Sequence, residues 1–531
     1  MRLRTSSVRP AKAGLILGAL VGVIALACLP FATTAGSYRD AEYGNVDLAV
    51  ESSQPKPVDG LQVNDRHSYL AQTMVALSTS GQAAYVWGNR GFGLSGTGQQ
   101  TVASDSDFSV VKLPNGKKMN QIVGGSSRGT SPGGHAAIAV LAEDGSVWTW
   151  GDAAPDRLGR PVTSKNNAQP VKVTFPGQVV VSDLRSGGSF FAALTTEGEL
   201  YTFGPPHQHG SKSSFGDLGQ GALAYGTAPR LILTKVHSFG VGVLNGWAVV
   251  APGWQSYTYP GGVDRPSAGP SKPGDAGEVL FWGYNSEIHG GAASGDPSLV
   301  RDSYAVPTRL ASDARLNVLL RKGTAAGDDN VSPGRVMGGP DDKGTFRHMT
   351  GNTYGNQVLL RDGTLWAWGT STFSGSGSSD TMLKRAAMVP TKVWLDNRKV
   401  KAVAHTWRLT FLLDETNTVW IYGQAGQGEA GVFPSASGLP PIRLSNRPVR
   451  IDGGSSPGWK AGGITAIASC GGMTAILKRD DTTTWLVGGS LLETKTNAMS
   501  LVRNSWSKAG NTTPVNAYQP ITKIDLTGLP G

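Results

Sequence analysis

Seven copies of one short pattern, spread along most of the 531-residue chain, constrain the fold more than any other feature. Each copy has an apolar run, then a turn that is usually acidic and rich in glycine, then aromatic or aliphatic residues that end in glycine. The terminal glycines of the seven copies are Gly88, Gly151, Gly204, Gly283, Gly369, Gly423 and Gly488. An internal repeat of this kind predicts one repeat architecture in place of several unrelated domains.

The local sequence of each copy predicts β-strands. Short apolar runs such as 136–141 and 357–360 have the length of buried strands. Asp-Gly or Glu-Gly then predicts a tight hairpin, because glycine adopts positive φ without strain. The next segment alternates, as in 365–368, which places Trp366 and Trp368 on one face of a strand. A proline-containing extended segment follows, so the sequence predicts an all-β fold, a β-propeller built from four-stranded blades.

The motifs between these strands resemble the RCC1 repeat family, named for the regulator of chromosome condensation. That family's repeat has an aromatic-x-aromatic-glycine segment, a Gly-Leu-Gly turn and a Pro-x-x-Val strand. The turn is matched at 91–94, 157–159, 217–220 and 426–431, and the strand at 169–173, 306–310 and 389–393. The resemblance extends over residues 61–528. It implies a seven-bladed propeller, and known members of the family mostly bind proteins.

Both ends of the repeat region predict how the ring closes. Residues 519–525 supply a last strand, but the strand that follows it in the repeat is missing at this end of the chain. Residues 67–77, before the first copy, have the sequence of that missing strand. One blade is therefore predicted to be shared between N-terminal and C-terminal strands, which would remove free sheet edges. Two blades are enlarged by segments rich in Gly, Pro, Ser and Asp, predicted to be insert loops at 252–274 and 322–343.

The N-terminus predicts export from the cell. An apolar run at 13–32 is preceded by four basic residues, Arg2, Arg4, Arg9 and Lys12. A basic segment followed by an apolar one is typical of a signal peptide or of a single membrane anchor. Residues 1–36 are therefore predicted to be one of these two, and residues 37–60 a linker. Lipidation of Cys28 is a third alternative.

Residues 35–43 resemble the ends of bacterial signal sequences that are cut by SipW-type signal peptidases. This resemblance implies a bacterial protein that is extracellular or attached to the cell surface. Contact with a membrane is expected only through the N-terminal segment.

The charge of the chain argues against nucleic acid as a partner. Lys and Arg number 48 and Asp and Glu 38, for a formal net charge of +10. Since four of the basic residues and none of the acidic ones lie in the first 35 positions, a processed chain would carry 44 minus 38, or +6. No run of Lys or Arg is longer than two residues, so no basic stripe marks a nucleic-acid site. The two cysteines exclude a disulfide framework.

The sequence predicts no catalytic residue, no metal site and no cofactor. Gly-x-Ser-x-Gly occurs three times, at Ser127, Ser131 and Ser456. None of these serines lies between a strand and a helix, where such a nucleophile is placed. His207 and His209 could bind a metal, but no carboxylate follows them before Asp217. Residues 328–330 and 341–342 could bind calcium, but neither segment has the 1-3-5 spacing of a dedicated loop. We therefore expect a protein that is not an enzyme, with calcium in the loops as an open alternative.

Aromatic residues in the first insert are the best candidates for binding. Trp254, Tyr257, Tyr259 and Arg265 lie close together in a polar segment, and aromatic and arginine side chains are typical interface anchors. The alternative is that these aromatic residues fold back and cover the fourth blade. Aromatic residues at strand positions are expected to belong to the core.

The sequence as a whole favours a non-catalytic, exported or cell-surface propeller that binds another macromolecule, a protein, through loops on its faces. One alternative is a secreted enzyme inhibitor similar to the β-lactamase inhibitory protein II type. A second is a binder of cell-wall glycan or other carbohydrate. A hydrolase or lyase with a site in the central channel is less favoured, because the predicted inner strands have few histidines or carboxylates.

Overall fold

In a computed structural model, the chain divides into two compact units, Met1–Lys56 and Pro57–Gly531. The structure describes residues 61–524 with gaps, of which the longest are 101–108, 127–135, 206–216, 269–277, 285–302, 310–345, 370–390, 424–447, 451–459 and 489–521. The predicted signal or anchor, the linker and the insert at 322–343 lie outside the described residues. Within the described ranges, no helix is long and apolar enough to cross a membrane.

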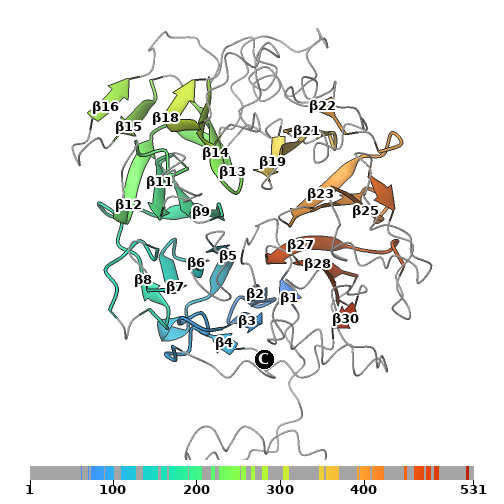
Figure 1. The fold of residues 1–531 in the computed structure, drawn as a ribbon, viewed down its shortest axis with the longest axis horizontal. Coiled ribbons are helices and arrows are strands. Elements are labelled where there is room, and N and C mark those ends of the chain that lie inside the picture. Colours follow the sequence, from blue (N-terminus) through green and yellow to red (C-terminus); the bar gives the residue numbers. More distant parts are fainter. Residues whose placement is uncertain are drawn as a thin grey trace, which may run out of the picture. The chain divides into compact units, whose positions relative to one another are not determined.

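The described strands form six sheets, four of which have four strands each in chain order (Figure 1). The first of these contains β1 (Leu61–Gln62), β2 (Thr73–Ser78), β3 (Ala84–Gly88) and β4 (Ser109–Val111). The second contains β5 (Met119–Ser126), β6 (Ala136–Ala142), β7 (Val147–Gly151) and β8 (Val171–Lys172), after a 3₁₀ turn at Pro114–Gly116. The third contains β23 (Val400–His405), β24 (Leu409–Asp414), β25 (Val419–Gly423) and β26 (Val449–Arg450). The fourth contains β27 (Ala466–Gly471), β28 (Thr474–Lys478), β29 (Thr484–Gly488) and β30 (Thr522–Ile524).

The two remaining sheets are larger. One has six strands, β9 (Val181–Ser186), β10 (Phe191–Thr195), β11 (Leu200–Gly204), β12 (Gly226–Leu233), β15 (Gln255–Thr258) and β16 (Arg265–Ala268). The other has eight, β18 (Ser303–Arg309), β17 (Glu278–Tyr284), β14 (Asn245–Val250), β13 (Val236–Val241), β19 (Phe346–Gly351), β20 (Gly355–Leu360), β21 (Leu365–Gly369) and β22 (Thr391–Lys392), in that spatial order. In this sheet β13 and β19 are joined by a single parallel pairing, Val241 with Thr350.

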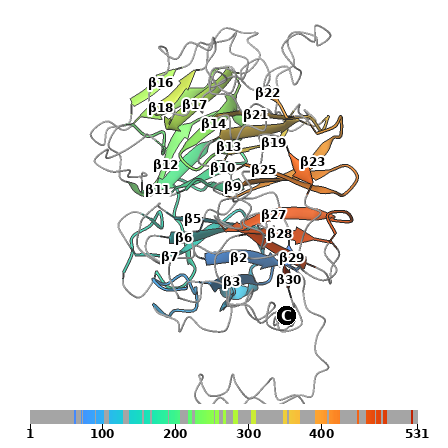
Figure 2. The same cartoon turned by 45° about the vertical axis from the view of Figure 1, so that its right-hand side comes forward.

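Successive sheets contact one another in a closed series. Strand β2 contacts β5, β5 contacts β9, β9 contacts β13, and β13 pairs with β19. Strand β20 then contacts β23, β23 contacts β27, and β27 contacts β2, which completes the circuit (Figures 1 and 2). This arrangement is a β-propeller, and no α-helix occurs among the described residues. The prediction of an all-β propeller is confirmed.

The predicted blade shared between the two chain ends is wrong for the described strands. Leu61 and Gln62 pair with Ser78 and Leu77, so the first sheet is completed by an N-terminal strand of its own. The last sheet is completed by β30, which pairs with β29. The sequence could not reveal β1, because two residues are too short to show any alternation.

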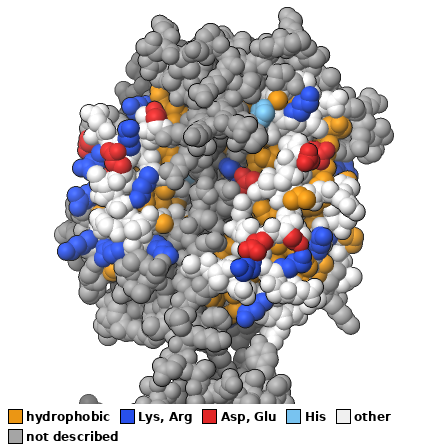
Figure 3. Space-filling model, turned by 180° about the vertical axis from the view of Figure 1, so that it is seen from behind, with side chains coloured by type: hydrophobic (Ala, Val, Ile, Leu, Met, Phe, Trp, Pro, Cys, Tyr) orange, Lys and Arg blue, Asp and Glu red, His pale blue; other side chains and the backbone are white. Residues whose placement is uncertain are grey.

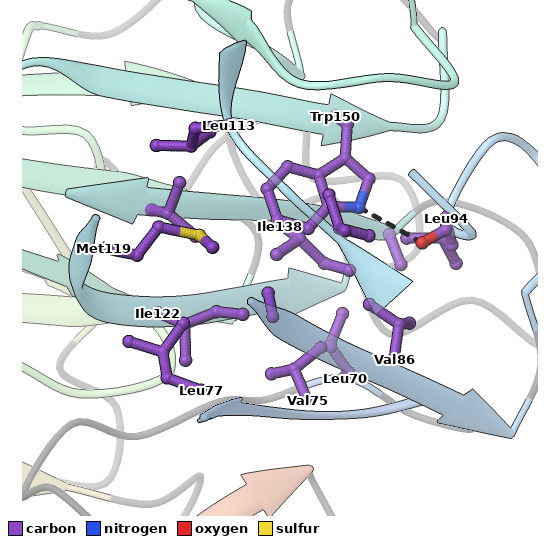
Figure 4. Close-up of a cluster of buried hydrophobic side chains, with 14 of the residues drawn as sticks. Leu70, Val75, Leu77, Val86, Leu94, Leu113, Met119, Ile122, Ile138 and Trp150 are labelled. Atoms are coloured by element: carbon purple, nitrogen blue, oxygen red, sulfur yellow. Dashed lines mark hydrogen bonds between the residues drawn. The ribbon is translucent and has the colours of Figure 1, made fainter. Parts of the chain in front are cut away.

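The hydrophobic core lies between neighbouring sheets. In the cluster drawn in Figure 4, Val75 and Leu77 of β2 pack with Ile122 of β5 and Ile138 of β6. Trp150 of β7 is fully buried in this cluster, and its Nε1 donates a hydrogen bond to the carbonyl of Leu94 at 3.1 Å. The expectation that strand aromatics are structural is confirmed at three fully buried residues, Trp150, Trp282 and Trp368.

The hairpins between the second and third strands have the predicted glycine turns. Gly145, Gly198 and Gly363 have φ of +77°, +77° and +86°. Of the two repeats that lack this glycine, the one at 416–423 has Asn417 at the same place, with φ +64°. Asparagine adopts the left-handed region more readily than most residues, which explains why the hairpin survives without glycine.

Candidate functional site

The insert after β14 contains a β-hairpin, where the sequence predicted only a loop. Strands β15 and β16 pair from Gln255 with Ala268 to Thr258 with Arg265. The hairpin extends the six-stranded sheet, because Leu233 of β12 pairs with Ser256. Two further hydrogen bonds hold the junction: the Thr234 N–H donates to the Gln255 carbonyl, and the Gln255 N–H donates to Thr234 Oγ1, both at 3.0 Å.

Trp254 fixes this hairpin to the propeller. Its side chain is 7% exposed and belongs to the cluster that also contains Leu233, Val236 and Leu280. Strand β15 in addition contacts β18, so the hairpin lies against two different outer strands (Figure 1). The sequence left two roles open for Trp254, binding a partner or covering the sheet. Its buried position fits the second role.

The other predicted binding residues have different positions. Exposure alternates along β15: Trp254 and Ser256 are buried, Gln255 is exposed and Tyr257 is half-buried. The Tyr257 hydroxyl donates a hydrogen bond to Gln255 Oε1 at 3.1 Å, so these two side chains lie together on the outward side of β15. Arg265 is the first residue of β16, opposite Thr258. Tyr259 lies outside the described residues.

A chain of polar side chains crosses the interior between two sheets. The Gln357 amide of β20 donates to Thr410 Oγ1 of β24 at 3.0 Å, and also to the Tyr422 hydroxyl of β25. Thr410 Oγ1 is in turn hydrogen-bonded to Nδ1 of His405 at 3.1 Å. Burial raises the pKa of the Tyr422 hydroxyl, which therefore stays neutral. All four side chains are at most 1% exposed, and their contacts join adjacent sheets.

The charges on the face seen in Figure 3 are mixed. On the side opposite to Figure 1, Lys and Arg side chains are interspersed with Asp and Glu (Figure 3). Lys117 is paired with Asp144 and Lys118 with Glu143, the latter at 3.9 Å. The hydrogen bonds from Lys117 and Ser146 lower the pKa of Asp144. Among the described residues, no group of three or more His, Cys, Asp and Glu side chains is placed to hold a metal ion.

Sequence reasoning missed one exposed aromatic residue, Phe92. It lies in the turn after β3, and its side chain is 49% exposed. A phenylalanine between two glycines, Gly91 and Gly93, was the available signal, because glycines on both sides leave little that could cover the ring. The sequence analysis used this segment only as one turn of the repeat.

Comparison with known proteins extends the similarity beyond single motifs. The family model described as "Regulator of chromosome condensation (RCC1) repeat" matches residues 144–194. The Ultraviolet-B receptor UVR8 of Arabidopsis thaliana is 25% identical over 411 residues, which are 75% of this chain and 74% of that protein. The human E3 ubiquitin-protein ligase HERC2 is 25% identical over 256 residues, which are 48% of this chain but only 4% of the ligase.

Two solved structures share the fold. Yeast RCC1 (Prp20), solved with Kap60 bound, aligns over 91% of both chains with a TM-score of 0.54 and 15% identity. Prp20p of Saccharomyces cerevisiae, described with its binding properties to Gsp1p and histones, aligns over 86% of this chain and 88% of its own, with a TM-score of 0.51 and 14% identity. At such identities the likeness concerns the fold.

Proposed function

Since this chain is an RCC1-like β-propeller, we propose that it is a non-catalytic protein, exported or held at the cell surface, that binds a protein partner through the β15–β16 hairpin. The observation that carries this proposal is the way the hairpin is built. Buried Trp254 holds it rigidly on the propeller, while Gln255 and Tyr257 project from the other side of β15. A rigid support lowers the entropic cost of binding, and tyrosine is among the residues enriched at interaction hot spots.

The two solved structures, both of yeast Prp20, are described with protein partners, Kap60 in one case and Gsp1p and histones in the other. These names support a protein as the class of partner and say nothing about its identity here. An inhibitor of another enzyme is one special case of the same proposal. The mixed surface charge described above gives no support to nucleic acid as the partner.

We further infer seven blades. The eight-stranded sheet consists of two four-stranded meanders, β13-β14-β17-β18 and β19-β20-β21-β22, and only one parallel pairing joins them. The six-stranded sheet is one four-stranded meander extended by the insert hairpin. Together with the four other sheets these give seven units, which agrees with the seven sequence repeats. An experimental structure with fewer than seven four-stranded meanders would contradict this count.

Export is tested separately from binding. If the N-terminal segment is a signal peptide, the mature protein isolated from the native host will begin near residue 36 and will be found outside the cytoplasm. A chain that begins at residue 1 and fractionates with membranes would identify the anchor alternative. A full-length chain in the cytoplasm would refute export.

Affinity capture from the native host, with the tagged full-length chain as bait, tests the binding surface. The captured protein is identified, purified and titrated against the wild-type chain and Tyr257→Ala. We expect Tyr257→Ala to weaken binding at least tenfold, since a hot-spot residue contributes about 2 kcal/mol or more. Lys172→Ala, an exposed position on β8, is the matched control and should bind normally.

The other outcomes are equally informative. A partner whose affinity is unchanged by Tyr257→Ala would refute the hairpin as the binding surface. Recovery of glycan in place of protein would refute the protein-binding proposal in favour of a wall binder. A captured enzyme whose activity falls on binding would identify the inhibitor class.

A further inference from the structure

The dipeptide Asn-Gly occurs twice in this chain, at Asn115–Gly116 and at Asn245–Gly246. The first pair lies in the 3₁₀ turn Pro114–Gly116, between β4 and β5. The second pair begins strand β14. An asparagine amide is open to attack by the next backbone nitrogen, and glycine in that position has no Cβ to hinder the approach. The chain therefore holds the same reactive dipeptide in two different surroundings.

The first pair is accessible. Asn115 and Gly116 are both exposed, and a Cβ added at Gly116 would have no heavy atom within 4 Å. Among the polar interactions of the described residues, none involves the side chain of Asn115. Its amide group is therefore open to water and rotates without breaking a contact.

The backbone of this turn must rotate before the amide and the nitrogen can meet. Asn115 has φ +61° and ψ +24°. At this ψ its Cβ and the Gly116 nitrogen lie on opposite sides of the Cα–C bond, so the two groups approach only after rotation about that bond. The turn is closed by a hydrogen bond from the Lys117 N–H to the Pro114 carbonyl at 3.5 Å, which is long. An exposed turn held by a long hydrogen bond permits this rotation.

The rotation leaves the core intact. Leu113 and Met119, on either side of the turn, are 3% and 1% exposed and belong to the cluster in Figure 4. The Met119 N–H donates a hydrogen bond to the Gly81 carbonyl at 2.8 Å. The two ends of the turn are thus fixed while its middle residues are exposed. Motion of the turn is therefore separate from unfolding of the sheets.

The second pair is protected by its strand. Asn245 is 1% exposed, and its Nδ2 donates a hydrogen bond to the Tyr284 carbonyl at 3.3 Å. In the ladder with β17, Asn245 lies opposite Gly283 and Gly246 opposite Trp282. A Cβ added at Gly246 would collide with the Trp282 ring. Rotation about ψ of Asn245 therefore requires β14 to leave the sheet.

We propose that Asn115 is a site of spontaneous covalent modification. The deprotonated backbone nitrogen of Gly116 attacks Cγ of Asn115 and forms a new C–N bond, while the bond to the side-chain nitrogen breaks and ammonia leaves. Water then opens the resulting cyclic succinimide at either of its two carbonyl carbons. The products are aspartate and isoaspartate at position 115. The net reaction consumes one water and releases one ammonia, so it needs no enzyme, metal or oxidant.

The modification changes both the charge and the length of the connection between the first two sheets. A carboxyl group, with an ordinary pKa of about 3.9, is ionised at neutral pH and adds one negative charge to the turn. It competes with Asp144 for Lys117, since these two side chains form an ion pair. In the isoaspartate product the main chain runs through the former side-chain carbon and is one atom longer. The site is independent of the proposed protein binding.

The experiment compares the two dipeptides in one molecule. The folded full-length chain is incubated in mildly alkaline buffer, and samples are digested with trypsin over time. Trypsin releases residues 113–117, in which Asn115 is the only amide side chain. Mass spectrometry and enzymatic methylation of isoaspartate measure the products. We expect modification at Asn115 to be at least about tenfold faster than at Asn245, because only the latter requires a strand to open.

A parallel sample in guanidinium chloride shows whether the fold causes this difference. In the unfolded chain both dipeptides are equally accessible, so the rate at Asn245 should rise to that at Asn115. Gly116→Ala tests the attacking atom. The structure leaves room for the added Cβ, which hinders the backbone nitrogen, so modification at Asn115 should slow by at least about tenfold. A denaturation curve of this variant confirms that it is folded.

Four results would overturn the proposal. In the folded chain, Asn115 could stay unmodified while the unfolded sample reacts, or the two dipeptides could react at equal rates. Aspartate without isoaspartate would indicate direct hydrolysis of the amide in place of ring closure. An unchanged rate in folded Gly116→Ala would show that the Gly116 nitrogen is not the attacking group.

Discussion

Two of the turns that put a non-glycine residue in the left-handed region differ in how they accommodate it; φ is +64° at Asn417 and +57° at Phe92. In the β24–β25 hairpin the residue is Asn417, whose side chain accepts a hydrogen bond from Lys401 and whose carbonyl accepts one from the Ile464 N–H. In the turn after β3 it is Phe92, whose ring is half exposed. At Asn417 residue type and backbone agree. At Phe92 they conflict, so the contacts around the turn must enforce the backbone conformation.

The largest expected effect concerns the support under the Phe92 turn. Trp150→Ala removes a fully buried indole and the hydrogen bond to the Leu94 carbonyl, so the free energy of unfolding should fall by about 3–5 kcal/mol. Urea denaturation measures the change. Trp148→Ala, at a half-buried position on the same strand, is the control and should cost clearly less. Equal losses in both variants would contradict the assignment of the inter-sheet core to Trp150.

The next effect concerns the Asn417 turn, which is organised by Asp414. Its carboxylate accepts hydrogen bonds from the Thr416 N–H at 2.9 Å, the Thr418 N–H at 2.8 Å and Trp420 Nε1 at 2.9 Å. Asp414→Asn weakens these charge-assisted bonds and should lower the free energy of unfolding by about 2 kcal/mol at pH 7. Asp362→Asn, in an exposed turn, is the control, and its free energy of unfolding should fall by less. An unchanged denaturation midpoint in Asp414→Asn would show that the carboxylate does not organise the turn.

The same carboxylate predicts a pH dependence. Burial by itself raises the pKa of Asp414, but the hydrogen bonds from Thr418, Trp420 and Thr416 together lower it below the ordinary value of 3.8. A lowered pKa in the folded state stabilises the fold above pH 3.8, and this contribution is lost as the pH falls below that value. The stability difference between wild type and Asp414→Asn should therefore shrink in acid. A difference that stays constant down to pH 2 would contradict the lowered pKa.

A smaller effect is expected at Asn417 itself. Asn417→Ala places a residue with little tolerance for positive φ in the turn and should destabilise the protein by about 1 kcal/mol, whereas Asn417→Gly should be close to neutral. Lys401→Ala measures how much of this loss of stability comes from the hydrogen bond between Lys401 and the Asn417 side chain. If Ala and Gly at position 417 gave the same midpoint in urea, the backbone explanation would be wrong.

The same comparison shows what the sequence could predict. The repeated strands and hairpins were predictable because each repeat satisfies the same local rules, with apolar runs, glycine at positive φ and alternating aromatic residues. Even the missing glycine did not mislead, since Asn417 fulfils its role. The hairpin of the insert was not predictable, because strands of four residues show no usable alternation and depend on the docking of Trp254 onto the sheet.

The candidate sites were predictable only in part. Clustering of aromatic residues identified the insert, but not that Trp254 would be buried while Tyr257 projects outward. Phe92 was missed because its unusual feature is a backbone angle. The glycines beside it indicate a turn, yet the turn is held by hydrogen bonds to residues far along the chain. Trp150 donates to the Leu94 carbonyl, Asn167 to the Phe92 carbonyl, and the Gly98 N–H to the Ala168 carbonyl. Such contacts are tertiary information.

The smallest effect is expected when the residue types of the two turns are exchanged. Phe92→Asn gives the turn after β3 the residue that the β24–β25 hairpin already has, so relief of strain should raise the free energy of unfolding by less than about 1 kcal/mol. The reverse change, Asn417→Phe, should lower it, because an aromatic residue at positive φ is strained and the hydrogen bond from Lys401 is lost. Urea denaturation of both variants, with the wild type alongside, measures the pair. A loss of stability in Phe92→Asn would mean that the ring stabilises the fold despite its exposure, and the contrast between the two turns would then be one of packing.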